Sequence, residues 1–316
     1  MSTGSNKVLV LFGPTAVGKT ATIERLRRDD RLPRKPVVVV SADSAQVYRG
    51  LDIGSAKPSP AERRETRHEL IDILDPTEPF SVGEFCRLAD EACELASAEG
   101  ALPVLSGGTA YYVKGFIYGP PPAPPADAAI RTELQRELSV RGPAALRAEL
   151  EAVDPVSAAR IAPADLYRTT RALEVYRCSG RPLSGYAPPT EPRPRWDCLV
   201  VGLDRPREEL YARIGARVDA MLASGLEREA DALIAAGYGR DAPGMKAIGY
   251  AEFLDAPTGP DGRRDVRAVA DAIKLHTRRY AKRQLTFMRA IPGVRWFGAD
   301  DYDGVADAAA EWLRSP

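Results

Sequence analysis

The sequence lacks the features that mark a secreted or membrane protein. It has only four cysteines, Cys86, Cys93, Cys178 and Cys198, with no C-x-x-C pair and no cluster of histidines. This pattern argues against a disulfide or zinc framework and is typical of reduced thiols in the cytosol. No apolar run approaches the length needed to span a membrane, and the start, MSTGSNK, has no apolar segment of a signal peptide. We therefore expect a cytoplasmic protein that does not bind a membrane.

The chain also lacks net charge. Its 44 Lys and Arg residues are balanced by 44 Asp and Glu residues, which excludes a uniformly basic nucleic-acid-binding protein but not a local basic patch. With 316 residues, 44% of them hydrophobic and 28% charged, the chain is typical of a globular protein with one large domain or two smaller ones.

Apolar runs alternate with helical patterns over the first third of the chain. Strands are expected at residues 8–12, 37–41, 68–74 and 102–109. Helices are expected after Lys19 and after Ser81. This alternation predicts an α/β fold in which helices flank a parallel sheet. Because ligands of such sheets bind at the carboxyl ends of the strands, residues 13–20, 41–58 and 106–115 should meet at one crevice.

Proline-rich segments mark the limits of a second region. The prolines of GPPPAPPAD (119–127) cannot continue a helix or join the centre of a sheet, and APPTEPRPRW (187–196) is similar. Three helical stretches lie between them, and CLVVGLD (198–204) then predicts a strand that returns to the sheet. The predicted boundaries are 1–115 and 206–316 for a P-loop catalytic core and 116–205 for a helical insertion domain.

The most specific motif is the phosphate-binding loop Gly13-x-x-x-x-Gly18-Lys19-Thr20, between an apolar strand and a helix. Backbone N–H groups of such a loop point into one concavity, and the following helix adds its dipole. Lys19 supplies a positive charge, and the Thr20 hydroxyl is a ligand for Mg²⁺. The alternative is a chance match on a tight turn. The motif predicts a bound phosphate group, but it does not decide between ATP and another diphosphate.

Two further strand ends carry polar side chains. Asp43 can accept a proton or hold a metal ion, or it can simply form a turn or a helix cap. In SGGTAYYVKG (106–115), the two glycines allow a ligand to approach the backbone, and Thr109 offers a hydroxyl that can also cap the next helix. Lys57 lies in a loop, where a solvated surface lysine is the expectation and a phosphate contact the alternative.

Two local clusters of basic residues break the overall neutrality. Arg168 and Arg171 are three residues apart on a predicted helix of the insertion, so they share one face. Lys274, Arg278 and Lys282 recur every four residues on a C-terminal helix whose face contains no acid to balance them. Such a row is either a solvated helix face or a contact surface for nucleic acid.

The sequence closely resembles the tRNA dimethylallyltransferase family, also called the tRNA isopentenyltransferases. The matching segments follow the family's order from residue 13 to about 297, nearly the whole chain. They are GPTAVGKT, DSAQVYRGLDIGSAKP, LIDILDP, FSVGEF, GGTAYYVKG, VDPVSAARIAPADLYRTTRALEVYRCSGRPLS, MKAIGYAEF and TRRYAKRQLTFMR. The departures are small: Leu51 stands where Met is usual, Ser55 where Thr is usual, and AYY (110–112) where Gly-Leu-Tyr is frequent.

The resemblance implies that the loop holds the diphosphate of dimethylallyl diphosphate rather than ATP, with Mg²⁺ as cofactor. The acceptor would be the N6 amine of the adenosine at tRNA position 37, just 3′ of the anticodon, so the partner is the anticodon stem-loop. The implied catalytic residues are Lys19, Thr109 and Asp43, the last as general base. The implied diphosphate site comprises Gly13, Pro14, Thr15, Ala16, Val17, Gly18, Lys19 and Thr20, with Arg213 or Arg217 of the RIGAR segment.

The resemblance also implies a set of tRNA contacts. They are Asp43, Ser44, Ala45, Gln46, Thr109, Arg131, Tyr167, Arg168, Thr169, Thr170 and Arg171. The basic C-terminal helix, with Lys274, Arg278 and Lys282, would then hold RNA phosphates.

Other functions remain open from the sequence. In a P-loop small-molecule kinase the insertion would be an arginine-rich lid, and a free-adenylate prenyltransferase would use the same cradle. An RNA-binding protein with a degenerate loop is a third alternative. A comparison of prenyl transfer to AMP with prenyl transfer to tRNA distinguishes the last two alternatives from the family's reaction. The sequence is compatible with a monomer and does not determine the oligomeric state.

Overall fold

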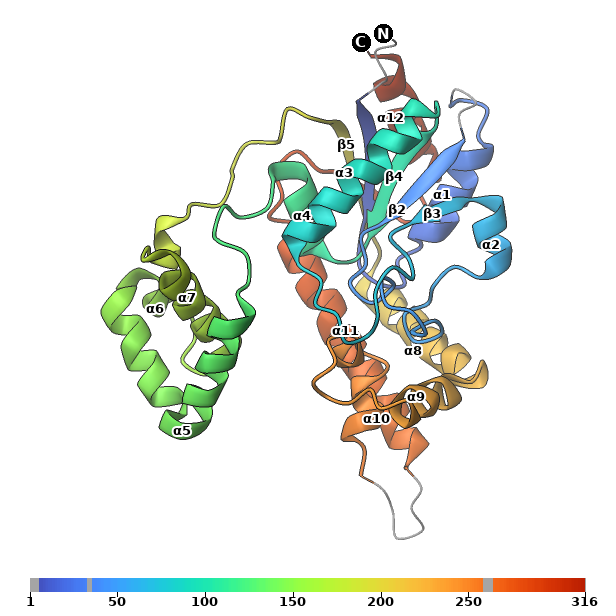
Figure 1. Ribbon diagram of the computed structural model, residues 1–316. Coiled ribbons are helices and arrows are strands. Elements are labelled where there is room, and N and C mark those ends of the chain that lie inside the picture. Colours follow the sequence, from blue (N-terminus) through green and yellow to red (C-terminus); the bar gives the residue numbers. More distant parts are fainter. Residues whose placement is uncertain (1–5, 33–35, 258–263, 316) are drawn as a thin grey trace. The chain divides into compact units, whose positions relative to one another are not determined.

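The computed structural model describes residues 6–32, 36–257 and 264–315, and its strands form a parallel sheet (Figure 1). The strands are β1 (Lys7–Phe12), β2 (Val37–Ser41), β3 (Arg67–Glu69), β4 (Leu102–Gly107), β5 (Asp197–Asp204) and β6 (Arg295–Gly298). Their order is β3-β2-β4-β1-β5-β6, and neighbours are parallel. All of β1 is buried, as expected for a central strand. The predicted α/β class is confirmed.

Helices cover both faces of this sheet. The α-helices before residue 119 and after residue 204 are α1 (Lys19–Arg28), α2 (Pro60–Glu65), α3 (Val82–Ala98), α4 (Ala110–Tyr118), α8 (Arg207–Ala223), α9 (Leu226–Ala235), α10 (Ala251–Asp255), α11 (Val266–Met288) and α12 (Tyr302–Arg314). Leu9 and Leu11, which point to one side of β1, share a core with apolar residues of α1, α8 and α12. On the other side α3 packs against β2, where Ala96 meets Val38. None of the described helices is both long and apolar enough to cross a membrane.

Two local predictions around the third strand are wrong. The strand predicted at 68–74 ends at Glu69, because Leu70 and Asp72 have φ of 62° and 58°, a left-handed conformation that no strand continues through. The carboxylate of Asp72 instead accepts a hydrogen bond of 2.5 Å from Lys57. Only 2% of the Lys57 side chain is exposed, so this lysine is a buried ion-pair partner rather than a solvated surface residue.

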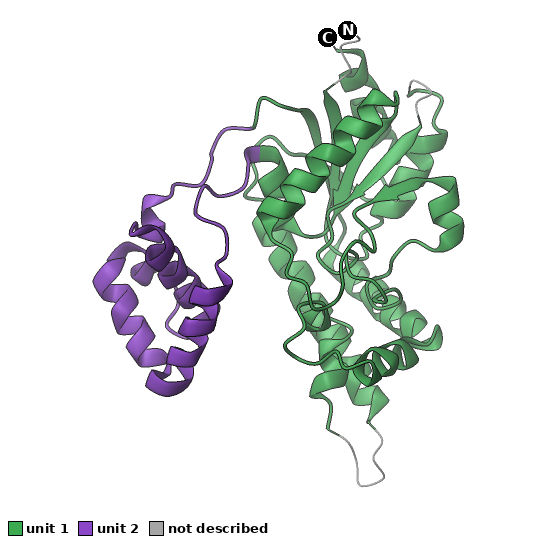
Figure 2. Ribbon diagram, in the orientation of Figure 1, with its two compact units in different colours: residues 1–117, 193–316 green, residues 118–192 purple. Residues whose placement is uncertain are grey.

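The chain folds into two compact units, residues 1–117 with 193–316 and residues 118–192 (Figure 2). The smaller unit contains α5 (Ala128–Val153), α6 (Pro155–Arg160) and α7 (Leu166–Ser179). Within α5 the backbone kinks at Gly142, ahead of Pro143. This unit is narrower than the predicted 116–205, because residues 197–204 form β5, which pairs with β1.

Candidate active site

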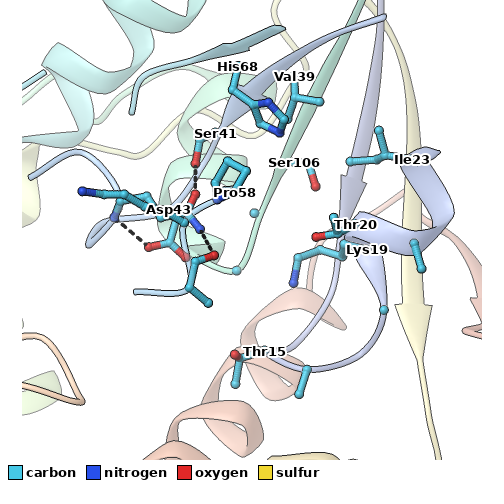
Figure 3. Close-up of a pocket in the computed structure, with 18 of the residues that line it drawn as sticks. Thr15, Lys19, Thr20, Ile23, Val39, Ser41, Asp43, Pro58, His68 and Ser106 are labelled. Carbon is cyan, nitrogen blue, oxygen red and sulfur yellow. Dashed lines mark hydrogen bonds between the residues drawn. The ribbon is translucent and has the colours of Figure 1, made fainter. Parts of the chain in front are cut away.

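A cavity of about 590 Å³ lies where the loops after β1, β2 and β4 meet (Figure 3). These three strands are neighbours in the sheet, so their carboxyl ends, and the loops that follow, share one edge. The segments predicted to converge on one crevice therefore do so. Helices α8 and α11 complete the wall with Arg213, Arg217, Tyr280 and Gln284.

Lys19, the first residue of α1, folds back over its own loop. Its Nζ donates hydrogen bonds to the carbonyl oxygens of Gly13 at 2.9 Å and Pro14 at 3.1 Å. Burial, followed by the charge of Arg217, lowers the pKa of Lys19 to about 8, while Asp43 acts in the opposite direction. A buried cation held by two neutral carbonyls is poorly compensated, so an anion in the cavity would be stabilised by this side chain.

Two arginines of α8 also line the cavity. Arg213 and Arg217 are one helical turn apart and therefore lie on one face. The Nε of Arg213 donates a hydrogen bond of 2.9 Å to the carbonyl of Ala16 in the phosphate loop. Burial lowers the pKa of Arg217, with Asp43 opposing this effect and Arg213 adding to it. The sequence left the choice between these arginines open, and both remain candidates for a diphosphate.

Asp43 follows β2 and faces the same cavity (Figure 3). Its Oδ1 accepts hydrogen bonds from the backbone N–H groups of Ala45 at 2.9 Å and Gln46 at 3.3 Å. The interpretation of Asp43 as a turn residue is thus correct for this oxygen. Among the described residues, no hydrogen bond reaches the second oxygen, Oδ2. The turn fixes the carboxylate and leaves one oxygen able to accept a proton.

Thr109 fastens the Asp43 turn to the end of β4. Its Oγ1 accepts a hydrogen bond of 3.0 Å from the backbone N–H of Ser44, and the described residues that line the cavity do not include Thr109. A Cβ on Gly107 would lie 2.1 Å from the carbonyl oxygen of Ala42. The close approach that this glycine permits is therefore made by the protein's own backbone, and not by a ligand as the sequence suggested.

Gln284 and Tyr280 of α11 are site residues that the sequence analysis missed. The Oε1 of Gln284 accepts from the N–H of Thr15 at 3.1 Å, and its Nε2 donates to the carbonyl of Gly108 at 2.6 Å. This amide joins the phosphate loop to the end of β4. Burial, and then the charge of Asp43, raises the pKa of Tyr280 to about 12, so its hydroxyl stays protonated. Two signals were in the sequence: the two residues are one helical turn apart, and both lie in the family-matching segment TRRYAKRQLTFMR.

Comparison with known proteins agrees with the family resemblance of the sequence. A family model described as IPP transferase matches residues 46–291, and one described as isopentenyl transferase matches residues 6–78. The chain belongs to the IPP transferase family. A tRNA dimethylallyltransferase of Geobacillus kaustophilus is 43% identical over 94% of this chain and 92% of its own length. One from Anaeromyxobacter sp. is 42% identical over 94% of this chain and 97% of its own length.

Solved structures of the family agree. A full-length tRNA isopentenylpyrophosphate transferase from Bacillus halodurans superposes with a TM-score of 0.67 at 37% identity, covering 98% of this chain and 99% of its own. A eukaryotic dimethylallyltransferase, whose structure was determined acting on tRNA, gives a TM-score of 0.74 at 24% identity, covering 98% of this chain and 78% of its own. The second likeness concerns the fold alone.

Gln46 is one of the tRNA contacts expected from the family, and its side-chain amide forms hydrogen bonds within the protein. Its Oε1 accepts from the hydroxyl of Ser41 at 2.9 Å, and its Nε2 donates to the carbonyls of Ser55 at 3.3 Å and Ala56 at 3.2 Å. The amide thus links the end of β2 to the loop that contains Lys57. The backbone N–H of the same residue donates to Asp43 Oδ1 at 3.3 Å, so Gln46 joins the Asp43 turn to this loop.

Two arginines of the helical unit that were expected to contact tRNA form ion pairs within that unit. Arg131 and Arg171 bind the carboxylate of Glu174 at 2.9 and 2.8 Å, and only 2% of the Glu174 side chain is exposed. Asp127, at the start of α5, donates its backbone N–H to the same carboxylate at 2.8 Å. This buried carboxylate, with several donors, joins the start of α5 to the middle of α7, so both arginines contribute to the fold of this unit.

The remaining residues of the segment 167–171 differ in exposure. Tyr167 is 75% exposed, and 71% of the Arg168 side chain is exposed although it pairs with Asp165. Thr169 is buried, and the hydroxyl of Thr170 donates back to the carbonyl of Leu166 at 2.9 Å. Tyr167 and Arg168 are therefore the most exposed members of this segment.

The basic row on α11 is partly neutralised. Lys274 binds Asp219 of α8 at 2.5 Å, so the expectation that no acid balances this face is wrong for Lys274. The guanidinium of Arg278 lies over the ring of Tyr211 at 5.5 Å. Lys282 lines a second cavity of about 610 Å³, and the described residues offer it no ion-pair partner. The acid that balances Lys274 belongs to a different helix, so the sequence of α11 alone does not reveal it.

Proposed function

We propose that the chain is a cytoplasmic tRNA dimethylallyltransferase. It would transfer the dimethylallyl group of dimethylallyl diphosphate to the N6 amine of the adenosine at tRNA position 37 and release diphosphate. The observation that carries this proposal is one cavity that combines a phosphate loop and two arginines with the uncommitted oxygen of Asp43. The names of the relatives support the same reaction.

The leaving group determines the first requirement. When the allylic C–O bond breaks, its electron pair stays on the diphosphate, so catalysis needs positive charge and N–H donors that are already in place. Lys19, Arg213 and Arg217 line one cavity and supply that charge. A diphosphate would replace the carbonyl oxygens of Gly13 and Pro14 as the partner of the Lys19 ammonium.

Thr20 fits the proposed Mg²⁺. Magnesium is commonly bound by one or two protein oxygens, with substrate phosphates and water completing its six ligands. The hydroxyl of Thr20 lines the cavity next to Lys19, and the described residues contain no group of three or more His, Cys, Asp or Glu side chains that would form a dedicated metal cage. Bound there with the diphosphate, the ion would neutralise charge on the leaving group.

Asp43 is the proposed general base. As the N6–C bond forms, the amine must lose a proton, and Oδ2 of Asp43 is the acceptor that the geometry leaves available. The adenine must leave the base stack of the anticodon loop to reach the cavity, and loop bases are those that proteins read most readily in RNA. Exposed cations such as Arg168 would contact RNA phosphates.

Incubation of the protein with labelled dimethylallyl diphosphate and total tRNA, followed by nucleoside analysis, tests the proposal. Label should appear in N6-dimethylallyladenosine, should be absent from AMP offered alone, and should be absent with the Lys19→Ala variant. Label in AMP would instead indicate a free-adenylate prenyltransferase. ATP should be neither hydrolysed nor required, and phosphoryl transfer from ATP would indicate the kinase, an alternative that membership of the IPP transferase family already disfavours.

A further inference from the structure

The two connections between the units leave the larger unit at one point. One connection starts after Ile117, and the other ends at Arg193. The backbone N–H of Arg193 donates to the carbonyl of Ile117 at 2.8 Å, and its Nε donates to the carbonyl of Phe116 at 2.8 Å. Residues 76 positions apart in the chain, at the roots of the two linkers, are thus bonded directly to each other.

The same guanidinium is anchored to α3. Its Nη1 and Nη2 bind the two oxygens of Asp90 at 2.8 and 2.9 Å, and Trp196 donates its Nε1–H to Asp90 Oδ1 at 2.8 Å. Only 10% of the Asp90 side chain is exposed. The rings of Phe116 and Trp196 stack at 6.3 Å, and Arg193 lies over the Phe116 ring at 5.1 Å. We call Asp90, Phe116, Ile117, Arg193 and Trp196 the linker clamp.

We propose that Arg193 is a positioning residue for tRNA: the linker clamp holds the roots of both linkers together and so restricts the arrangements from which the helical unit engages its substrate. This inference rests on the proposed function. Two independent roots would leave the helical unit more conformations, and each conformation lost on binding costs free energy. The clamp reduces that cost before tRNA arrives. The cavity residues do not belong to it, so donor binding and chemistry should not depend on it.

Arginine is required here for a geometric reason. Its planar guanidinium bonds a carboxylate with two parallel N–H groups while a third N–H, on Nε, reaches a carbonyl. A lysine at 193 keeps the charge near Asp90 but cannot make the three bonds together. The variant Arg193→Lys should therefore release Phe116 and loosen both linkers without leaving Asp90 unpaired. Trp196→Phe is a milder variant, because it removes one N–H and keeps a ring against Phe116.

The test compares these two variants with wild type and with Arg31→Lys, a matched control. Arg31 also binds buried and exposed carboxylates of the larger unit, Asp29 at 2.7 Å and Asp303 at 2.9 Å, but none of its partners belongs to the linker clamp. The measurements are KM for tRNA, KM for dimethylallyl diphosphate, kcat, and hydrogen–deuterium exchange of peptides that cover residues 116–127 and 187–197. Thermal unfolding reports the stability of each variant.

We expect Arg193→Lys to raise KM for tRNA about tenfold, equivalent to ~1.4 kcal/mol, and to speed exchange in both linkers. KM for the donor and kcat should stay within about twofold. Trp196→Phe should act in the same direction by a smaller factor, and Arg31→Lys should lower stability without moving KM for tRNA. Unchanged linker exchange in both clamp variants, or equal changes for both substrates, would overturn the inference. If wild type shows no prenyl transfer, the proposed function fails. The role of the linker clamp is then tested by whether the clamp variants change the affinity for tRNA and the hydrogen–deuterium exchange of the linkers.

Discussion

Replacing Asp43 by Asn removes one chemical capacity and preserves most of the geometry. In the native protein Oδ1 accepts from the N–H groups of Ala45 and Gln46, and the amide oxygen of Asn can accept the same bonds. The NH₂ group of Asn then takes the place of Oδ2, and this group cannot accept a proton as the carboxylate oxygen can. The variant therefore separates the turn from the base.

The expected loss is in the chemical step. A positioned general base contributes about 10²–10⁴-fold, which corresponds to roughly 3–5 kcal/mol in the activation barrier. A pure turn residue would lose at most about 1 kcal/mol of stability when its acceptor becomes neutral, with almost no loss in rate.

Single-turnover rates with a preformed enzyme–tRNA complex, measured over a range of Mg²⁺ concentrations, distinguish the roles. A base predicts a slow step that excess metal does not rescue, whereas a metal ligand predicts a raised Mg²⁺ requirement and partial rescue. Asp75→Asn is the matched control, because Asp75 makes a similar turn, accepting from the N–H of Thr77 at 3.0 Å, and the described residues that line the cavity do not include it. Near-wild-type turnover of Asp43→Asn would refute the assignment.

Four further outcomes are expected. Lys19→Ala should abolish prenyl transfer while tRNA affinity, measured by filter binding, changes less than about twofold, and a parallel loss of both would show that Lys19 supports the fold or the RNA site. Arg168→Ala should lower the slope of log K against log salt by about one unit, and an unchanged slope would exclude a phosphate contact. Chelation should stop turnover and Mg²⁺ restore it, and Thr20→Ala should raise the half-saturating Mg²⁺ concentration. Hydrogen bonding to Arg177 lowers the pKa of Glu137 from 4.5 to about 2. The ion pair therefore contributes fully to the stability of the folded protein above about pH 5, and this contribution is lost as pH falls toward 2. The difference in Tm between wild type and Glu137→Gln should therefore shrink over that interval, and a constant difference would contradict the ion-pair argument.

Local patterns in the sequence were sufficient for the frame of the protein. A run such as VLVLF followed by GPTAVGKT specifies a buried strand, a phosphate loop and a helix within 21 residues, 8–28, because side-chain burial and loop chemistry act between near neighbours. The kinked helix of the smaller unit is similarly local, since Gly142 and Pro143 interrupt it wherever it packs. Resemblance to a family added the reaction, which no local pattern contained.

Tertiary structure decided which partners the polar side chains have. Arg131 and Arg171, which stay predicted contacts of RNA, both bind the buried Glu174, and Lys274 binds an acid on another helix. Gln284, which joins two loops of the cavity, lies 176 positions from Gly108. A charged or amide group satisfies whichever partner the fold brings within about 3 Å, and that distance is set by the packing of elements far apart in the chain. The sequence thus determined the phosphate loop and the strands and helices of the sheet apart from the extent of the third strand, while the pairing of their polar groups was fixed only when the elements packed.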